Sequence, residues 1–512
     1  MNSHTPRFTV PYPVFLFVFV LSFNINPLFA QPAGWQTGQF EHHQDIGDPE
    51  LEGSVEYNEE EQTYLVSAGG LNMWDDMDQF HFLWKKIKGD FIIYATVEFI
   101  GEGTDPHRKL GIIARDHLTA DSRYVDGAVH GDGLTSLQFR PKKGDDTDER
   151  PLRSNHPTHI ELQRTGNRFT FSAAGFGENY RSVSLEMELN EEVFAGLFLT
   201  SHREDVQEQA VFRNVRIVIP PDADYTPYSD YIGSHLEVMD VETGHRKILH
   251  SIPHSLQAPN WTPDNQYLIY NEEGLLYKYR LEDGEISQLN TGFADANNND
   301  HVLSFDGSMM GISHHTGPDG VSTIYTLPAS GSDNPVKMTS ENSGASYLHG
   351  WSPDAGKLIF TGYRNGQYDI WQVDIETREE KALTNHSTLD DGSEYTPDGE
   401  YIYFNSSRTG TMQIWRMRPD GSDQEQVTFD EYNDWFPHIS PDGKWIVYLS
   451  YQPDIDPEDH PFYQKIYLRL MPVSGGVPRT IAYLFGGQGT INVPSWSPDS
   501  KKISFVSNSK LE

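Results

Sequence analysis

The chain of 512 residues contains no cysteine. It therefore has no disulfide, no thiolate metal site and no cysteine to receive a lipid anchor. An exported chain without cysteine suits a bacterial periplasm, or secretion from a bacterium, better than a disulfide-rich animal secretome.

Positive charge is scarce. Lysine and arginine number 38 against 75 aspartates and glutamates, which gives a formal net charge of −37 at pH 7. A surface this acidic repels nucleic acid and anionic membranes, which argues against both as partners. An acidic polysaccharide stays open as a partner, because a local basic site could hold one. The plain alternative is that the charge serves only solubility.

Long apolar runs are absent after residue 30. Residues 1–30 have the pattern of a secretory signal peptide: Arg7 in a short polar start, an apolar run over 14–21, and Ala30 before Gln31. The run is too short to span a bilayer comfortably. We therefore predict its removal and a periplasmic or secreted bacterial protein without a membrane span. An uncleaved anchor is the alternative, and the bulky Leu28 leaves the exact cleavage site open.

Amphipathic stretches of helix length are absent between residues 34 and 220. Short alternating runs occur instead, over 91–97, 109–114, 158–162, 168–171 and 211–219. Strands of this length, divided by polar turns, predict a β-sandwich over 34–220. The order of its motifs, with Gly-Ile-Ile-Ala-Arg-Asp at 111–116 and Phe-Arg-Asn-Val-Arg-Ile at 212–217, resembles the concanavalin-A-like or laminin-G-like jelly rolls of carbohydrate-active enzymes. Residues 221–233 then form an extended linker.

Aromatic side chains of this sandwich are candidates for a carbohydrate-binding face. Four of them share one strand, in which alternation places His81 on the opposite face from Phe80 and Phe82. The alternative is that these side chains are the core of the sandwich. The candidates are Trp74, Phe80, His81, Phe82 and Trp84.

A repeated phrase sets the architecture of the rest of the chain. Six times a serine or threonine is followed by a Pro-Asp-Gly-like turn and an alternating apolar strand. The six aspartates are spaced by 42, 48, 44, 44 and 57 residues, the period of one four-stranded propeller blade. They are Asp264, Asp306, Asp354, Asp398, Asp442 and Asp499.

The last copy ends after two strands, and residues 235–249 look like the outer half of a blade without its inner half. Pairing these segments would close a six-bladed ring and protect its edges. The repeat resembles the TolB-like propeller family over residues 234–512. The resemblance implies an all-β protein, a jelly-roll sandwich followed by a six-bladed propeller closed by its N- and C-terminal strands. Such propellers include docking modules, peptidase gates and polysaccharide lyases.

Histidines recur near the start of the innermost strands, which line the channel in this fold. The equivalent positions around the ring are Asn260, His301, His349, Glu394, His438 and Ser495. Imidazole and carboxylate groups that converge can hold a divalent cation or form a general acid/base set. We predict His301, His349, His438 and Glu394 as metal ligands, and His349, His438 and Glu394 as catalytic residues. A hydrogen-bonded lining of a water-filled channel is the alternative.

The same theme resembles the oligogalacturonate lyases, propellers whose channel histidines carry a metal. Manganese or zinc suits the imidazole and carboxylate groups of the channel. The resemblance implies an arginine, Arg364 or Arg408, that meets the uronate carboxylate. The alternative role of both arginines is to stabilise their hairpins. Further candidate binding residues are Asn260, His314, His315 and Trp435. The insertion 453–461 has three possible roles. His460 could cap the channel mouth, or the acidic neighbours of His460 could bind Ca²⁺. The third possibility is that the segment is a solvated loop.

Two functions remain. The first is an exported, monomeric binding protein that recognises an oligo- or polysaccharide, or an envelope protein, through the channel face and the sandwich. The alternative is a metal-dependent glycan-cleaving enzyme, a lyase or a glycosidase, whose active site is the histidine-lined channel.

Overall fold

A computed structural model describes residues 37–154 and 156–511. The predicted signal peptide lies outside the described residues. Apart from one 3₁₀ helix, η1 (Glu341–Ser343), every regular element described is a β-strand, which confirms the all-β prediction. Within the described part, no helix has the length and apolar character that crossing a bilayer requires.

Two seven-stranded antiparallel sheets form the N-terminal domain. In spatial order, the first sheet contains β1 (His42–Ile46), β4 (Phe80–Lys88), β13 (Glu192–Thr200), β6 (Lys109–Arg115), β7 (Tyr124–His130), β8 (Thr135–Arg140) and β9 (Asp148–Pro151). The second contains β12 (Arg181–Glu186), β11 (Arg168–Ala174), β10 (His159–Thr165), β5 (Phe91–Ile100), β14 (Arg203–Val218), β3 (Thr63–Gly70) and β2 (Ser54–Asn58).

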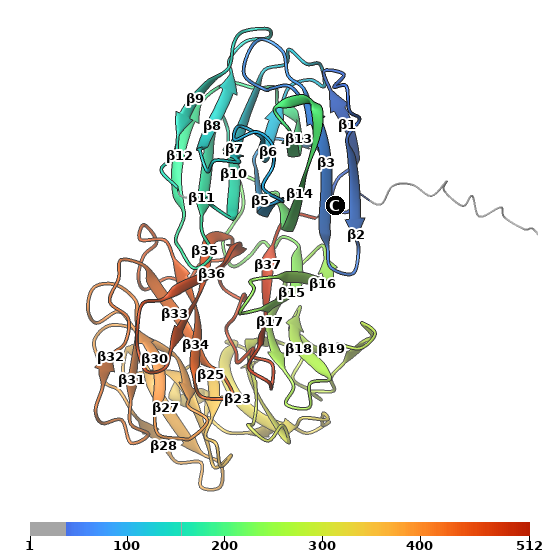
Figure 1. Cartoon of the computed structure of the whole chain (residues 1–512). Helices are drawn as coiled ribbons and strands as arrows, with labels where there is room; N and C mark the ends of the chain where they lie inside the picture. The colour runs from blue at the N-terminus through green and yellow to red at the C-terminus, as the bar shows by residue number, and fades with distance from the viewer. Residues whose placement is uncertain (1–36, 155, 512) are drawn as a thin grey trace, which may run out of the picture. The chain divides into compact units, whose positions relative to one another are not determined.

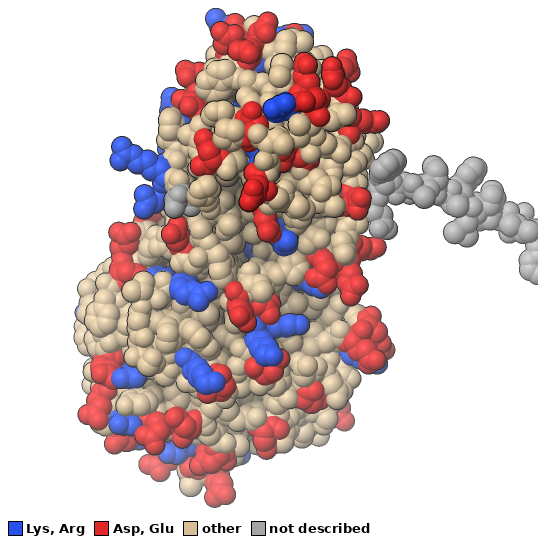
Figure 2. Space-filling view, viewed as in Figure 1, with Lys and Arg blue, Asp and Glu red and all other residues tan. Residues whose placement is uncertain are grey.

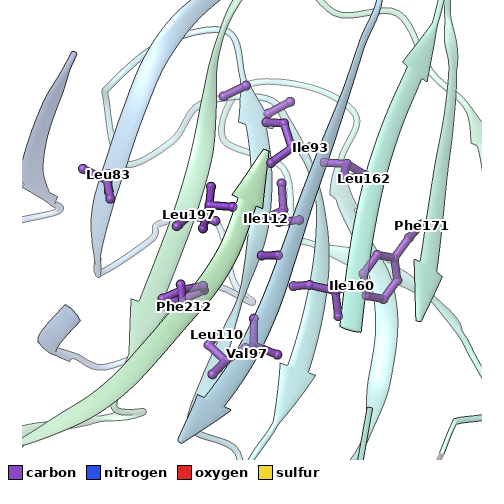
Figure 3. Packing of buried hydrophobic residues seen from close by; sticks show 14 of the residues in the cluster. Leu83, Ile93, Val97, Leu110, Ile112, Ile160, Leu162, Phe171, Leu197 and Phe212 are labelled. Atoms are coloured by element: carbon purple, nitrogen blue, oxygen red, sulfur yellow. The ribbon is translucent and has the colours of Figure 1, made fainter. Parts of the chain in front are cut away.

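The main apolar core lies between these sheets (Figure 3). Leu83 and Ile112 of the first sheet and Ile93 and Phe212 of the second belong to one buried cluster. Because side chains alternate along a strand, each sheet directs one set of apolar residues to the other sheet. The domain is therefore a sandwich held by burial of apolar surface.

The candidate sugar-binding aromatics are buried. Phe80, Phe82 and Trp84 lie on the face of β4 opposite Leu83. They belong to a second buried cluster, which is separate from the core between the two sheets. His81 takes the other face, as alternation predicts, where its Nδ1 lies 2.7 Å from Asp45 Oδ1. The three buried rings thus have a packing role and offer no open platform. Trp74, in the loop before β4, is partly exposed.

Six small antiparallel sheets follow, each a blade of the ring (Figure 1). The first blade contains β17 (Leu256–Trp261), β18 (Tyr267–Glu272), β19 (Leu275–Arg280) and β20 (Ile286–Gln288). The second contains β21 (Asn297–Leu303), β22 (Met309–Thr316), β23 (Val321–Pro328) and β24 (Val336–Lys337). The third contains β25 (Ser346–Trp351), β26 (Lys357–Arg364), β27 (Gln367–Asp374) and β28 (Glu380–Ala382). The fourth contains β29 (Asp390–Tyr395), β30 (Ile402–Ser406), β31 (Gln413–Met417) and β32 (Glu425–Gln426). The fifth contains β33 (Asn433–Ile439), β34 (Trp445–Tyr451), β35 (Gln464–Pro472) and β36 (Arg479–Gly486).

The sixth blade is built from both ends of the propeller. Its strand β15 (Ser234–Asp240) pairs on one side with β16 (Arg246–Ile252) and on the other with β37 (Lys502–Asn508). A bridge between Trp496 and Ile503 continues the sheet toward the channel. The predicted closure of the ring is confirmed.

One buried carboxylate fastens this closure. Glu237 of β15 accepts hydrogen bonds from Arg216 and Arg246, each at 2.6 Å, and from the Ser507 hydroxyl at 2.5 Å. Burial alone would raise the pKa of Glu237, but the two guanidinium groups hold it well below its usual range. Arg216 belongs to β14, so the same carboxylate also ties the sandwich to the ring.

The repeated turn is a local hydrogen-bonded unit. In each copy the serine or threonine hydroxyl donates to the aspartate two residues later, at 2.6 to 2.7 Å. The same hydroxyl can also accept a backbone N–H at the start of the next strand, as Ser352 does from Lys357 at 2.9 Å. The turn thus sets the corner between the innermost strand and its neighbour in every blade.

We predict that Val238→Pro strongly destabilises the protein. Val238 pairs with Lys247 and with Ser504 in the middle of the closing sheet. Proline in a central strand removes a ladder hydrogen bond, and the buried acceptor left unpaired costs about 1–3 kcal/mol. Denaturant unfolding measures the effect. The matched control is Val336→Pro, which lies in the edge strand β24 and should change the midpoint little. Equal loss in both variants would contradict this role of the closing sheet.

Candidate functional site

Two cavities lie at opposite ends of the innermost strands. The polar cavity has a volume of about 470 Å³ and includes residues from the first halves of β21, β25 and β29. Its lining is Asn298, Asn299, Asp300, His315, Tyr347, His349, Thr361, Tyr368, Leu389, Asp391, Phe436, Glu458, His460, Gln488 and Asn492. Among these described residues there is no lysine or arginine.

The opposite, apolar cavity has a volume of about 350 Å³ and is formed where the same strands end in their repeated turns. Prolines of the repeats and the tryptophans Trp261, Trp351 and Trp496 line much of it, together with Asn260 and Glu394. The two ends of the channel therefore have different chemistry, one polar and one largely apolar.

A bulge in the innermost strands explains which side chains face which cavity. The pairing register shifts between Gln257 and Asn260, and at the corresponding place in β21, β25, β29 and β33. A bulge inserts an extra residue and turns the side chains that follow it. The equivalent positions predicted from the repeat lie at or next to these bulges, so they do not all point into one space.

Asp391 is the centre of the polar cavity's charged groups. Its Oδ1 lies 3.0 Å from His349 Nε2 and accepts hydrogen bonds from Thr361 at 2.5 Å and from the Gly392 N–H at 2.7 Å. Burial alone would raise the pKa of Asp391, but His349, His460 and the Thr361 hydroxyl lower it to about 2. In turn, Asp391 raises the pKa of His349 against the opposite effect of burial. The two groups form a buried contact that is an ion pair when His349 is protonated, the state that its raised pKa favours.

Asp300 has the opposite electrostatic character. Burial raises its pKa to about 7, the nearby Asp391 carboxylate adds to the rise, and His349 partly opposes it. Asp300 lines the same cavity as Asp391. The cavity thus contains one carboxyl group that is ionised throughout the physiological range and one that titrates near neutrality.

His460 reaches the cavity from the insertion between β34 and β35. Its Nε2 lies 3.9 Å from Asp391 Oδ2, and its ring packs at 4.6 Å from that of Trp435 and 5.8 Å from that of Phe436. His460 therefore lines the channel mouth, one of the roles expected from sequence. Trp435, expected to bind ligand, is fully buried and instead supports the His460 ring.

His438 and Glu394 satisfy each other. His438 Nδ1 lies 2.6 Å from Glu394 Oε2, and its Nε2 lies 2.5 Å from the Ile491 carbonyl. The other Glu394 oxygen accepts the Ile439 N–H at 3.0 Å. Both ring nitrogens and both carboxylate oxygens are therefore occupied by contacts that join neighbouring blades.

His301 is isolated from the other predicted ligands. It is fully buried, its Nε2 lies 3.1 Å from the Ile269 carbonyl, and burial lowers its pKa to about 4. Across residues 37–154 and 156–511, no group of three or more His, Asp or Glu side chains is arranged to hold a metal ion. The four predicted ligands thus do not share one site, and manganese, zinc or calcium binding stays a prediction from the sequence.

Both candidate arginines hold their hairpins. Arg364 donates to Glu380 and to Ser346, each at 2.9 Å. Arg408 donates to Asp390 at 2.7 Å and lies 4.7 Å from the Trp415 ring centre. These contacts agree with the alternative role expected for both arginines, which is to stabilise their hairpins. Neither arginine lines the polar cavity.

The remaining candidates are divided between different surroundings. Asn260 accepts the Leu303 N–H at 3.0 Å beside the apolar cavity. His314 packs against the rings of Phe293 and Tyr325, and burial lowers its pKa. His315 lines the polar cavity, where its Nδ1 lies 2.9 Å from the Gly320 carbonyl.

A closed ring of six blades whose channel opens into a cavity at each end defines a channel-bearing β-propeller. Residues 332–457 match the family model described as the TolB β-propeller domain. An uncharacterized protein of Agrobacterium fabrum is 44% identical over 274 residues, which cover 53% of this chain and 92% of that protein. The structure of a putative TolB from Agrobacterium tumefaciens has 43% identity and a TM-score of 0.52, covering 55% of this chain and 99% of that chain. The chain belongs to the TolB-like β-propeller family.

An oligogalacturonate lyase in complex with manganese is also similar, at 13% identity and a TM-score of 0.33, over 52% of this chain and 73% of that chain. At this distance the likeness carries no argument about activity. The function must be inferred from the residues of the cavities themselves.

We predict that Asp300→Asn makes stability less dependent on pH. The pKa of Asp300 is about 7 in the folded protein and about 4 in the unfolded chain. Between these pH values the unfolded chain loses the proton while the folded protein keeps it, so the stability of the folded protein falls as pH rises from about 4 to about 7. Asparagine abolishes this decline, which amounts to at most about 4 kcal/mol. Denaturant unfolding at pH 4 and pH 8 compares the variant with wild type and with Asp319→Asn, an exposed control. The same pH dependence in all three proteins would show that Asp300 is not the responsible group.

Proposed function

We propose that the protein is an exported binding protein whose polar cavity recognises a neutral glycan. Export rests on the sequence of residues 1–30. Glycan recognition rests on one observation, the chemistry of the polar cavity.

The lining of this cavity suits the hydroxyl groups of a sugar. Asn298, Asn299 and Asn492 offer planar amides that can both donate and accept hydrogen bonds, and Asp300 and Asp391 offer carboxyl groups. Tyr347 and Tyr368 add aromatic faces against which the apolar C–H surface of a sugar ring can pack. A few convergent polar groups with aromatic walls are typical of a small-molecule site, and about 470 Å³ lies within the usual size range.

Charge narrows the class of glycan. The described lining includes Asp300, Asp391 and Glu458 but no lysine or arginine, and His349 is already paired with Asp391. A uronate or sulfate would meet these carboxyl groups with no lysine or arginine to neutralise it, and only His315 and His460 remain as basic side chains of the lining. The exterior carries the same bias, because acidic side chains outnumber basic ones on the face that Figure 2 shows. The expected arginine–uronate contact is therefore set aside in favour of a neutral or amino sugar.

Tyr368→Ala should weaken glycan binding about tenfold, which corresponds to about 1.4 kcal/mol. Tyr368 is 37% exposed and its side chain lines the cavity, so truncation removes a stacking face without opening the core. Titration calorimetry with neutral, amino and acidic oligosaccharides measures the effect.

Phe429→Ala is the matched control, because Phe429 is 75% exposed and lies outside the polar cavity. Tighter binding of acidic than of neutral glycans would contradict the proposal. No binding of any glycan, together with specific capture of one envelope protein, would favour the docking function instead.

A second candidate function, glycoside hydrolysis, is favoured by one specific observation. Asp300 and Asp391 line the same cavity while their pKa values are displaced in opposite directions, to about 7 and about 2. Such a pair supplies the protonated acid and the ionised carboxylate that most glycosidases use. The absence of lysine and arginine from the described lining favours hydrolysis over elimination at a uronate.

If the protein is a hydrolase, Asp300→Asn should abolish product formation and leave glycan binding within a few-fold of wild type. Prolonged incubation of the bound glycan, followed by mass spectrometry, detects the products. Asp319→Asn should retain full activity. An unaltered glycan after incubation with the wild-type protein would eliminate this candidate and leave the binding function.

A further inference from the structure

A third cavity continues the polar cavity. This side cavity has a volume of about 400 Å³ and shares Asn298, Asn299, His315 and Gln488 with the polar cavity. Four residues line both spaces, so the two cavities adjoin, and we refer to them together as the cleft. The cleft runs from the channel mouth to the linker that precedes the propeller.

The far side of this cleft has an aromatic wall. Tyr228 and Tyr231 of the linker pack edge-on against Phe462 of the insertion between β34 and β35, with ring centres 5.7 and 5.5 Å apart. The Tyr228 hydroxyl donates to Asp459 at 2.8 Å and so fixes its ring. Nevertheless Tyr228 and Tyr231 remain 49% and 45% exposed. They present fixed apolar faces to the cleft that the chain itself does not cover.

Planar amides lie between this wall and the tyrosines of the polar cavity. Asn492 Nδ2 donates to Gln488 Oε1 at 2.9 Å, which orients both groups. Asn298 and Asn299 stand in the shared part of the lining. An elongated cleft with aromatic faces toward both ends and amides between them fits a ligand that repeats a ring and its hydroxyl groups.

We infer that the cleft binds a linear neutral oligosaccharide extending through both cavities, with the wall of Tyr228, Tyr231 and Phe462 as a distal subsite. This inference rests on the proposed function and deepens it. A single sugar would occupy only the polar cavity, whereas longer chains would gain the stacking contact of the wall. Affinity should therefore rise with chain length.

The test uses the full mature chain and titration calorimetry with cello-, xylo- and chito-oligosaccharides of one to six sugars. For a series that binds, wild-type affinity should rise at least tenfold between the shortest and the longest ligand. Tyr231→Ala should abolish that rise and leave the affinity for the shortest ligand unchanged. Tyr368→Ala should lower the affinity for ligands of every length. Tyr231→Phe should behave as wild type because it keeps the ring. Phe429→Ala is the exposed control.

The two hypotheses fail in different ways. No binding of any length overturns the proposed function and the inference together. Equal affinity for all lengths, or a uniform loss in Tyr231→Ala, overturns the distal subsite while the glycan-binding function stands. Thermal unfolding of each variant separates loss of the subsite from loss of the fold, and Tyr231→Phe tests the ring alone.

Discussion

The pairing of β37 with β15 is the interaction on which the rest of the propeller depends. It joins strands about 270 residues apart, and around it Glu237 gathers two arginines and a serine. Only a closed ring brings Gln488 and Asn492, which precede β37, beside Asn298 of the second blade. The polar cavity is therefore a product of closure and cannot exist in any blade alone.

The buried carboxylates of the ring differ in their partners and in their pKa. Glu237, Glu394 and Asp391 each contact a cationic or imidazole partner, and removal of one member of such a pair is costly. Asp300 differs from these three, because burial raises its pKa to about 7.

The repeat in the sequence was sufficient to predict the all-β class, the six blades and the closure, because each signal is local and recurs at a fixed period. The cavity was harder to predict. Asp300, His349, Asp391 and His460 come from different blades, and their meeting depends on ring geometry that no single segment encodes. Counting along the repeat also selected His301 and His438 as candidate site residues. The bulge in the innermost strands turns side chains away from the direction that simple alternation gives, and these two do not line the polar cavity.

The hydrogen-bonded turns described above have a consequence for the order of folding. Each serine or threonine bonds an aspartate only two residues away, so every blade can form its inner corner as soon as that segment has been synthesised. Strand β37 is made after all the other propeller strands, and its partner is far back in the chain. Closure is thus a late, high-contact-order step, and until it occurs the nascent propeller exposes two unpaired strand edges that can pair with another chain.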